Sequence, residues 1–215
     1  LRPPPPVQPK VRVLIVDDAV VMRRLLSEAL KRDPRIEVVG TAPNGRIALQ
    51  KIPQVNPDLV TLDMEMPDMD GLATLHELRR TYPKLPVIMF SALTQRGAVS
   101  TLDALAAGAD DYVTKPVESS DLAGCIAQLE AELVPKIHAH CRKPFLSAAN
   151  SVPPLANART TPPFAGRART CELICIGTST GGPNALAELF QKITTPLSVP
   201  VAIVQHMPPN FTASL

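Results

Sequence analysis

Acidic side chains follow two short apolar runs, where they could bind a cation or accept a transferred group. Val13–Val16 is followed by the adjacent carboxylates Asp17 and Asp18, and Leu59–Leu62 is followed by Asp63. Short apolar runs without polar alternation are typical of buried parallel strands. The carboxyl ends of such strands are where open α/β sheets place their chemistry. For Asp63 a structural role is the alternative, since many strands end in an Asp that only caps the next turn.

Two further apolar runs end in polar residues of other kinds. Val87–Phe90 is followed by Ser91, and Asp111–Thr114 is followed by Lys115. If all four runs are neighbouring parallel strands, three carboxylates, a hydroxyl and an ammonium group meet at one edge. Crowded carboxylates repel one another unless a cation neutralises them, and hard oxygen ligands suit Mg²⁺. The order of these residues therefore indicates an acidic site for a divalent cation.

A second group of residues could perform nucleophilic catalysis. Gly177–Gly181 fits the pattern G-x-S-x-G, between an expected strand (Glu172–Ile176) and an expected helix. In that context the turn lifts the Ser179 hydroxyl to the edge of the sheet. The N–H groups at the helix start favour a developing oxyanion. A serine needs a base to take its proton, and His206 ends the next expected strand, Pro200–Gln205.

Two other interpretations compete for this second group. The loop could hold a phosphate, although it lacks the Lys-Ser/Thr of a P-loop and the pattern G-x-G-x-x-G. His206 could be an ordinary, partly buried histidine. The order of the residues also differs from α/β-hydrolases, where an acid lies between the serine and the histidine. No aspartate follows Asp121, so we expect an orienting acid to lie beyond Leu215.

Strands and helices alternate five times between Lys10 and about Val134, which predicts a parallel sheet with helices on both faces. The expected strands are Val11–Val16, Ile36–Gly40, Leu59–Leu62, Val87–Phe90 and Asp111–Thr114. The expected helices are Ala19–Arg32, Asn44 to Ile52 with Pro53 as its end, Leu72–Arg80, Ala98–Ala107 with Gly108 as its cap, and Ser119–His138. The last should bury Leu122, Ile126, Leu129 and Leu133 on one face.

Composition divides the chain into four parts. Residues 1–10 form a Pro-rich leader, 11–138 the first domain, 139–170 a Pro-rich linker and 171–215 the start of a second α/β domain. Roughly 45 residues bury too little surface for a stable domain of this kind. The chain also begins at Leu and stops within a patterned segment. We therefore expect a fragment whose second domain is incomplete.

Composition also excludes several classes of function. The formal charge of the 215 residues is +2 and only 3% are aromatic, which argues against nucleic acid as a partner. No apolar run is long enough to span a bilayer, and the N-terminus lacks the apolar core of a signal peptide. The four cysteines have no paired spacing, so we expect free thiols in a reducing cytoplasm.

The set Asp17, Asp18, Asp63, Ser91, Tyr112 and Lys115 resembles the response-regulator receiver domain of two-component signalling. The resemblance implies a flavodoxin-like, doubly wound fold. It implies that Asp63 accepts a phosphoryl group from the histidine kinase of a chemotaxis system. Asp18, Asp63 and the Glu65 backbone carbonyl would hold Mg²⁺, with Asp17 assisting through water. Lys115 would pair with the phosphoryl group, and Ser91 would bind it and couple to Tyr112 as a switch.

Ile176–Pro183 and Val204–Pro209 resemble the catalytic domain of chemotaxis protein-glutamate methylesterases (CheB), a family that joins a receiver to this domain. The resemblance implies that Ser179 attacks the methyl ester of a glutamate in a methyl-accepting chemotaxis receptor, with His206 as base and then acid. It also implies deamidation of receptor glutamines and no cofactor for the hydrolysis. Without the acid, the chain as given is expected to be inactive.

Two rival functions remain for comparison. A phosphorylation-dependent binding module without enzymatic output would not need Ser179 and His206 at strand ends. A transcription factor would need a basic helix-turn-helix after the linker, whereas a strand, a Gly-rich loop, a helix and a strand are expected there. We also expect the unphosphorylated first domain to cover the entrance to Ser179, so that phosphorylation of Asp63 loosens the contact.

Overall fold

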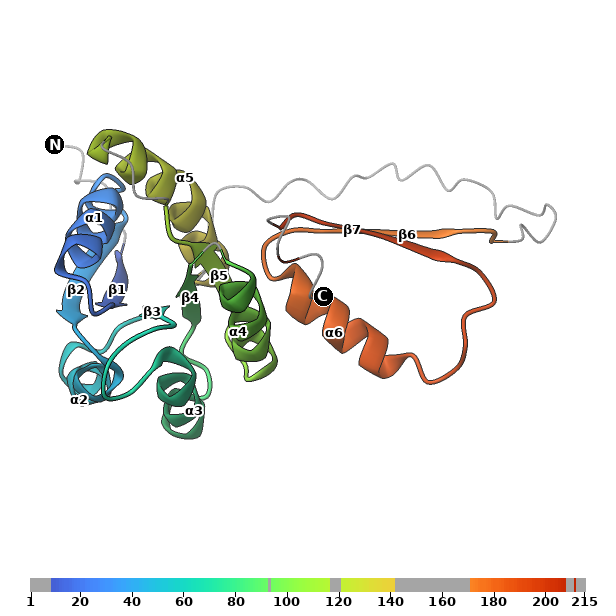
Figure 1. Ribbon diagram of the computed structural model, residues 1–215, viewed down its shortest axis with the longest axis horizontal. Helices are drawn as coiled ribbons and strands as arrows, with labels where there is room; N and C mark the ends of the chain where they lie inside the picture. The colour runs from blue at the N-terminus through green and yellow to red at the C-terminus, as the bar shows by residue number, and fades with distance from the viewer. Residues whose placement is uncertain (1–8, 93, 117–120, 142–170, 208–210, 212–215) are drawn as a thin grey trace, which may run out of the picture.

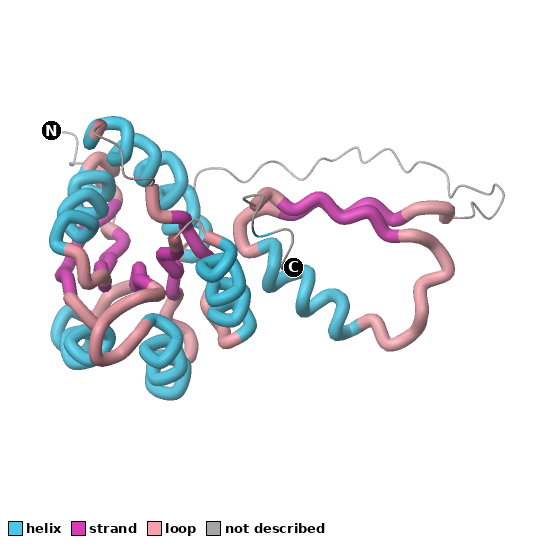
Figure 2. Tube along the Cα trace, viewed as in Figure 1, coloured by secondary structure: helices cyan, strands magenta, loops and turns pink. Residues whose placement is uncertain are grey.

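The computed structural model describes residues 9–92, 94–116, 121–141, 171–207 and 211. Most of the expected leader and linker, and the expected helix start at Ser119, lie outside these residues. Five parallel strands form one sheet in the order β2-β1-β3-β4-β5, with helices on both sides (Figures 1 and 2). This arrangement confirms the predicted doubly wound α/β fold. The strands are β1 (Val11–Val16), β2 (Ile36–Ala42), β3 (Leu59–Asp63), β4 (Val87–Ser91) and β5 (Asp111–Thr114). The helices are α1 (Val20–Lys31), α2 (Gly45–Val55), α3 (Gly71–Thr81), α4 (Gln95–Ala106) and α5 (Leu122–His140).

Each face of the sheet has its own apolar core, because alternate strand residues point to opposite faces. On one face, Leu14, Leu62 and Met89 pack with residues of α2, α3 and α4. On the other face, Ile15 and Phe90 pack with residues of α1 and α5. The central strands are therefore covered on both sides, which explains why their sequences read as continuous apolar runs.

The strand order reverses at β1, which pairs with β2 on one side and with β3 on the other. The connections that follow β1 and β3 therefore leave the sheet toward opposite faces. In open α/β sheets a crevice forms at such a point, outside the carboxyl ends of the strands. Asp17 follows β1 and Asp63 ends β3, so the topology brings these two carboxylates to that crevice.

Several sequence predictions are wrong in detail: α4 begins at Gln95 and not at Ala98, and β2 continues to Ala42 and not only to Gly40. Pro53 does not end its helix: α2 continues to Val55, and Asn56 ends it in the left-handed conformation. A Pro near the end of a helix removes one hydrogen bond without forcing the chain to stop. Leu122 does not join the buried face of α5, since it is 59% exposed. The strand expected at Glu172–Ile176 is displaced by two residues.

After residue 170 the described chain forms a second, two-stranded parallel sheet with one helix. The elements are β6 (Ile174–Thr178), α6 (Gly182–Lys192) and β7 (Val201–Gln205). They lie beside β5, which is the edge strand of the larger sheet, and beside the helix α4 (Figure 1). Asn184 Nδ2 donates to the Ala109 carbonyl oxygen at 2.6 Å. The second unit thus contacts the segment that leads into the edge strand of the first.

No helix within the described ranges combines the length and the apolar character needed to cross a bilayer. The longest, α5, has 19 residues and carries charged and polar side chains such as Glu130, Glu132 and Lys136.

Asp33 links the amino end of β2 to the last turn of α5, and its loss should destabilise the first unit. Its carboxylate is 8% exposed and accepts from Arg35 Nη2 at 2.6 Å and from His138 Nε2 at 2.8 Å. Bonds of this kind contribute about 1.5–3 kcal/mol each when a charge is involved. We expect Asp33→Asn to lower the free energy of unfolding by about 1–3 kcal/mol at pH 7, measured by urea titration with circular dichroism.

The pH dependence of this effect follows from the direction of the pKa shift. The hydrogen bonds from Arg35 hold the pKa of Asp33 well below its ordinary value, against the opposing effect of burial. The stabilisation is therefore complete above the unfolded-state pKa of about 4 and is lost as the pH falls further. The difference between parent and Asp33→Asn should shrink as the pH falls below about 4. Glu77→Gln, which breaks an exposed pair with Arg80, is the control and should change stability by less than about 1 kcal/mol. An equal effect of the two variants would contradict the assignment.

Candidate functional site

An acidic pocket lies at the carboxyl ends of β1 and β3. Asp17 and Asp63 are 0% and 1% exposed, whereas Asp18 is exposed. Lys115 Nζ lies 2.7 Å from Asp63 Oδ2 and 3.5 Å from Asp17 Oδ2. One carboxylate oxygen from each of the three aspartates lies within 4.8 Å of the others. The structure thus brings together the acidic and basic residues that the sequence placed on separate strands.

Local backbone contacts hold these side chains in place. Asp17 Oδ1 accepts from the Ala19 backbone N–H at 2.8 Å, just before α1 begins. Asp63 Oδ1 lies 3.4 Å from the Glu65 N–H. The Lys115 N–H donates to the Ser91 carbonyl oxygen at 2.8 Å, which continues the pairing of β4 with β5. The sheet itself therefore aims the lysine at the two buried carboxylates.

Burial dominates the electrostatics of the pocket. It raises the pKa of Asp63 to about 6, although the hydrogen bond and charge of Lys115 act in the opposite direction. Burial raises the pKa of Asp17 as well, again opposed by Lys115. Burial alone would lower the pKa of Lys115, but Asp63 and Asp17 hold it above its ordinary value. One ammonium group thus compensates two buried carboxylates only in part.

The residues present fit a divalent cation. Asp17 Oδ2 is buried and accepts no hydrogen bond. The ammonium group of Lys115 lies 3.5 Å from it but is shared with Asp63, so a second cation would lower the cost of burying this oxygen. The three carboxylates supply the oxygen ligands that Mg²⁺ prefers. A cavity of about 500 Å³ opens beside them, lined among others by Asp18, Asp63, Glu65 and Lys115. The cavity leaves room for a small anionic group next to the cation.

Ser91 and Tyr112, which the resemblance couples to each other, contact different partners in this structure. Ser91 Oγ donates to the Gly97 carbonyl oxygen at 3.0 Å, and Ser91 also lines the acidic pocket. The Tyr112 ring instead stacks on Phe211, with centroids 4.9 Å apart and planes at 9°. Burial and the Asp111 charge raise the pKa of Tyr112 to about 12. Tyr112 therefore contacts the second unit.

Ser179 and His206 come together because of the register of the second sheet. Thr178 and Gln205 are the last paired residues of β6 and β7, so the residue after each one emerges at the same edge. The His206 N–H donates to the Thr178 carbonyl oxygen at 3.0 Å. Gly181 has a φ of 68°, a conformation that favours glycine. It turns the chain from Ser179 into α6, which begins at Gly182.

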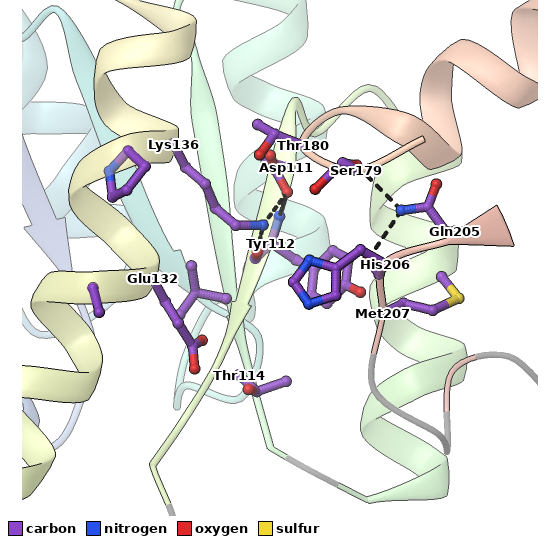
Figure 3. A pocket seen from close by; sticks show the side chains of 13 residues that line it. Asp111, Tyr112, Thr114, Glu132, Lys136, Ser179, Thr180, Gln205, His206 and Met207 are labelled. Carbon is purple, nitrogen blue, oxygen red and sulfur yellow. Dashed lines mark hydrogen bonds and ion pairs between the residues drawn. The ribbon is translucent and has the colours of Figure 1, made fainter. Parts of the chain in front are cut away.

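A second cavity, of about 430 Å³, lies between the two units. Ser179 and His206 line one side of it, and β5 and α5 form the other side (Figure 3). No hydrogen bond joins these two side chains, both of which lie in the described part of the chain. The arrangement places a hydroxyl and an imidazole in one pocket, which suits acyl transfer with the histidine as base.

Sequence reasoning missed the residues that connect the units. Asp111 is 3% exposed, and its Oδ2 accepts from His140 Nε2 at 3.2 Å and from the Gly181 N–H at 3.2 Å. Its Oδ1 accepts from Lys136 Nζ at 2.7 Å. Although burial acts to raise it, the bonds from His140 and Lys136 lower the pKa of Asp111. The sequence signal for this contact was that a charged residue, Asp111, begins an otherwise apolar strand.

Comparisons with known proteins match both units. Residues 13–127 match the family described as response regulator receiver domain, and residues 174–215 match the family described as CheB methylesterase. A protein-glutamate methylesterase/protein-glutamine glutaminase of Trichodesmium erythraeum is 50% identical over 96% of the chain and 59% of that protein. One of the same description from Nocardioides is 51% identical over 95% of the chain and 56% of that protein. The chain thus spans somewhat more than half the length of these relatives.

A solved structure gives the same result for the first unit. The response regulator domain of Thermotoga maritima CheB has a TM-score of 0.55 and 39% identity, and the match covers 61% of this chain and 96% of that one.

Proposed function

The chain belongs to the response-regulator receiver family, and from this premise we propose that it is the phosphorylation-controlled part of a chemotaxis ester hydrolase. Its substrate is the methyl ester of glutamate side chains in methyl-accepting chemotaxis receptors, and it also deamidates glutamines there. The strand register carries the proposal, because it brings Ser179 and His206 to one edge beside a cavity. A binding module without enzymatic output has no use for that pair.

Ester hydrolysis proceeds in two stages at Ser179. His206 takes the hydroxyl proton while Oγ attacks the ester carbonyl carbon, and the resulting oxyanion is stabilised by backbone N–H groups near the start of α6. The carbon–oxygen bond to the methoxy group then breaks, and His206 gives its proton to the leaving methanol. Water attacks the acyl-enzyme with His206 again as base, which frees the glutamate carboxylate and restores Ser179. Deamidation follows the same steps with ammonia as the leaving group. The hydrolysis needs no cofactor.

The acidic pocket is the site of phosphorylation. Asp63 receives a phosphoryl group from the histidine kinase of the chemotaxis system, and Lys115 pairs with that group. Asp18, Asp63 and the Glu65 carbonyl oxygen would hold Mg²⁺, with Asp17 assisting through water. When bound, the cation would supply positive charge to neutralise the crowded carboxylates and the incoming phosphoryl oxygens. Ser91 binds the phosphoryl group and couples it to Tyr112. We place the protein in the cytoplasm, from which both the histidine kinase and the chemotaxis receptors can be reached.

Contacts between the two units support docking of the first unit beside Ser179, which is itself exposed in this arrangement. The unphosphorylated first unit, residues 11–138, docks on the second unit, residues 171–215. Residues 139–170 are the linker that connects the two units. Asp111, Tyr112 and Ala109, in or next to β5, hold Gly181, Phe211 and Asn184 of the second unit. Lys115, at the other end of the same strand, contacts Asp63. A shift of β5 on phosphorylation would therefore reach the docking contacts directly.

Removing the stack on Tyr112 should loosen this docking. Phe211 is 0% exposed and packs face to face with the Tyr112 ring. An aromatic pair of this kind contributes about 0.5–1.5 kcal/mol beyond the area that it buries, and this part alone corresponds to roughly a 2- to 13-fold change in an equilibrium. We define the complete enzyme as this chain continued to the full length of its relatives. In it, Phe211→Ala should raise the rate of methanol release without a phosphodonor by a factor in that range.

Ile47→Ala is the control, because Ile47 is 37% exposed on α2, which packs beside β1 and β2 at the far side of the first unit from the second. It should leave the basal rate unchanged. Deleting residues 1–140 should raise the basal rate at least as much as Phe211→Ala does. If the deletion variant were no faster than the unphosphorylated complete enzyme, the first unit would not inhibit by covering Ser179. It would instead have to activate ester hydrolysis by direct contact.

A further inference from the structure

The side chain of Gln205 lies between the two residues that the proposed hydrolysis uses. Gln205 is the last residue of β7, directly before His206, and its register partner Thr178 directly precedes Ser179. Its Nε2 donates to the Ser179 carbonyl oxygen at 3.2 Å and to the His206 carbonyl oxygen at 3.0 Å (Figure 3). Its Oε1 accepts from Thr178 Oγ1 at 2.5 Å. One carboxamide thus connects both strand ends.

We propose that Gln205 is a positioning residue that fixes Ser179 relative to His206 through these three hydrogen bonds. An amide NH₂ group has two N–H donors, and both are used on main-chain oxygens. Gln205 therefore has no N–H left for a substrate or an oxyanion. It acts on the reaction through the backbone of the two residues that it holds. This inference rests on the proposed function of Ser179 and His206.

The hydrogen bonds of Gln205 hold the carbonyl oxygen of Ser179, which the pairing of β6 with β7 does not reach. Parallel backbone pairing of β6 and β7 ends at Thr178 and Gln205, so the residues beyond belong to loops. The Gly182 N–H also donates to the Ser179 carbonyl oxygen, at 2.8 Å. That oxygen is thus held by a donor from α6 and a donor from β7. Its position fixes the peptide plane that follows Ser179.

Gly182 makes the space that the Gln205 carboxamide occupies. A Cβ atom at position 182 would lie 2.0 Å from Gln205 Oε1 and 2.8 Å from Cδ. The atoms met are the end of a flexible side chain, so Gly182→Ala should displace the carboxamide with little change to the backbone. The substitution removes the three bonds while leaving Gln205 in the sequence. It is therefore an independent probe of the same interaction.

Kinetics of the complete enzyme test the inference. Misplacement of reacting groups by about 1 Å costs up to roughly 100-fold in rate. We expect Gln205→Ala to lower kcat for methanol release about 10- to 100-fold with KM changed less than about threefold. Gln205→Glu, which keeps the acceptor and loses both donors, should be as slow. Gln191→Ala, an exposed glutamine on α6, is the control and should match the parent.

A double-variant cycle separates positioning from general destabilisation. Gly182→Ala should slow the parent as Gln205→Ala does, but should add little in the Gln205→Ala background, since the group that it displaces is gone. Additive losses would overturn the inference. Equal kcat values for parent and Gln205→Ala would overturn it as well. Thermal unfolding followed by circular dichroism checks that each variant is folded.

The rate of Ser179 modification by a fluorophosphonate gives a readout that does not need the receptor substrate. If the parent is labelled at Ser179 and Gln205→Ala is labelled more slowly, the inference holds even where methanol release is absent and the proposed substrate is wrong. If both are labelled equally fast, the inference fails and the proposed function stands. If Ser179 of the parent is not labelled, both fail, because Ser179 is then not an activated nucleophile.

Discussion

Replacing Ser179 with alanine should abolish methanol release from methylated receptor by the complete enzyme. The variant loses the atom that forms the acyl-enzyme, while His206 and the shared cavity remain. Removal of a serine nucleophile that acts as a unit with its base costs on the order of 10⁶ in kcat in a well-studied serine protease. The remaining rate should therefore be indistinguishable from the uncatalysed background.

His206→Ala should be nearly as slow, because the hydroxyl and the imidazole act together and their losses are not additive. Ser198→Ala is the matched control, since Ser198 is exposed and lies outside the regular elements. It should retain the parent rate. A Ser179→Ala or His206→Ala enzyme that kept a tenth of the parent rate would rule out the Ser–His mechanism.

Phosphoryl transfer to the chain should be lost completely when Asp63 is replaced by asparagine. With Mg²⁺ and a small acyl phosphate, we expect the parent to gain one phosphoryl group, at Asp63. The reason is that this buried carboxylate lies 2.7 Å from Lys115 Nζ and opens onto a cavity of about 500 Å³. An amide oxygen is too weak a nucleophile to form the acyl phosphate. The sequence contains no tryptophan, so intact mass is the appropriate measurement.

Asp68→Asn controls for the loss of one negative charge in the loop that follows β3. Asp68 is exposed and has a φ of 65°, a conformation that asparagine also tolerates. It should be labelled like the parent. Labelling of Asp63→Asn to the same extent as the parent would discard the assignment of the acceptor. Omission of Mg²⁺ should slow labelling strongly, because the three carboxylates then repel the incoming phosphoryl group.

The sequence predicts the first unit well because its signals are local and redundant. Each buried strand reads as an apolar run, and Asp17, Asp63 and Lys115 mark where three of them end. Such patterns fix which residues lie at the sheet edge before any tertiary contact is known. The G-x-S-x-G turn similarly places Ser179, even though β6 starts and ends two residues later than expected.

The contacts that the sequence does not predict are those between distant parts of the chain. Leu122 fits the helical period of α5, yet it lies in the first turn of that helix and is 59% exposed. Tyr112 fits the switch position of a receiver, but its partner here is Phe211, far along the chain. The hydrogen bonds of Gln205 depend on the register between β6 and β7. Pairing partners of this kind are set by the fold and not by local periodicity.

Control of ester hydrolysis at Ser179 by phosphorylation of Asp63 is tested most directly by one rate comparison. The initial rate of methanol release from methylated receptor by the complete enzyme is measured before and after addition of Mg²⁺ and an acyl phosphate. A coupling free energy of about 1–3 kcal/mol predicts a rise of roughly 5- to 150-fold in the parent, and no rise in Asp63→Asn. Methanol release that is absent in both conditions, or that rises equally in Asp63→Asn, would contradict the control of Ser179 by phosphorylation of Asp63.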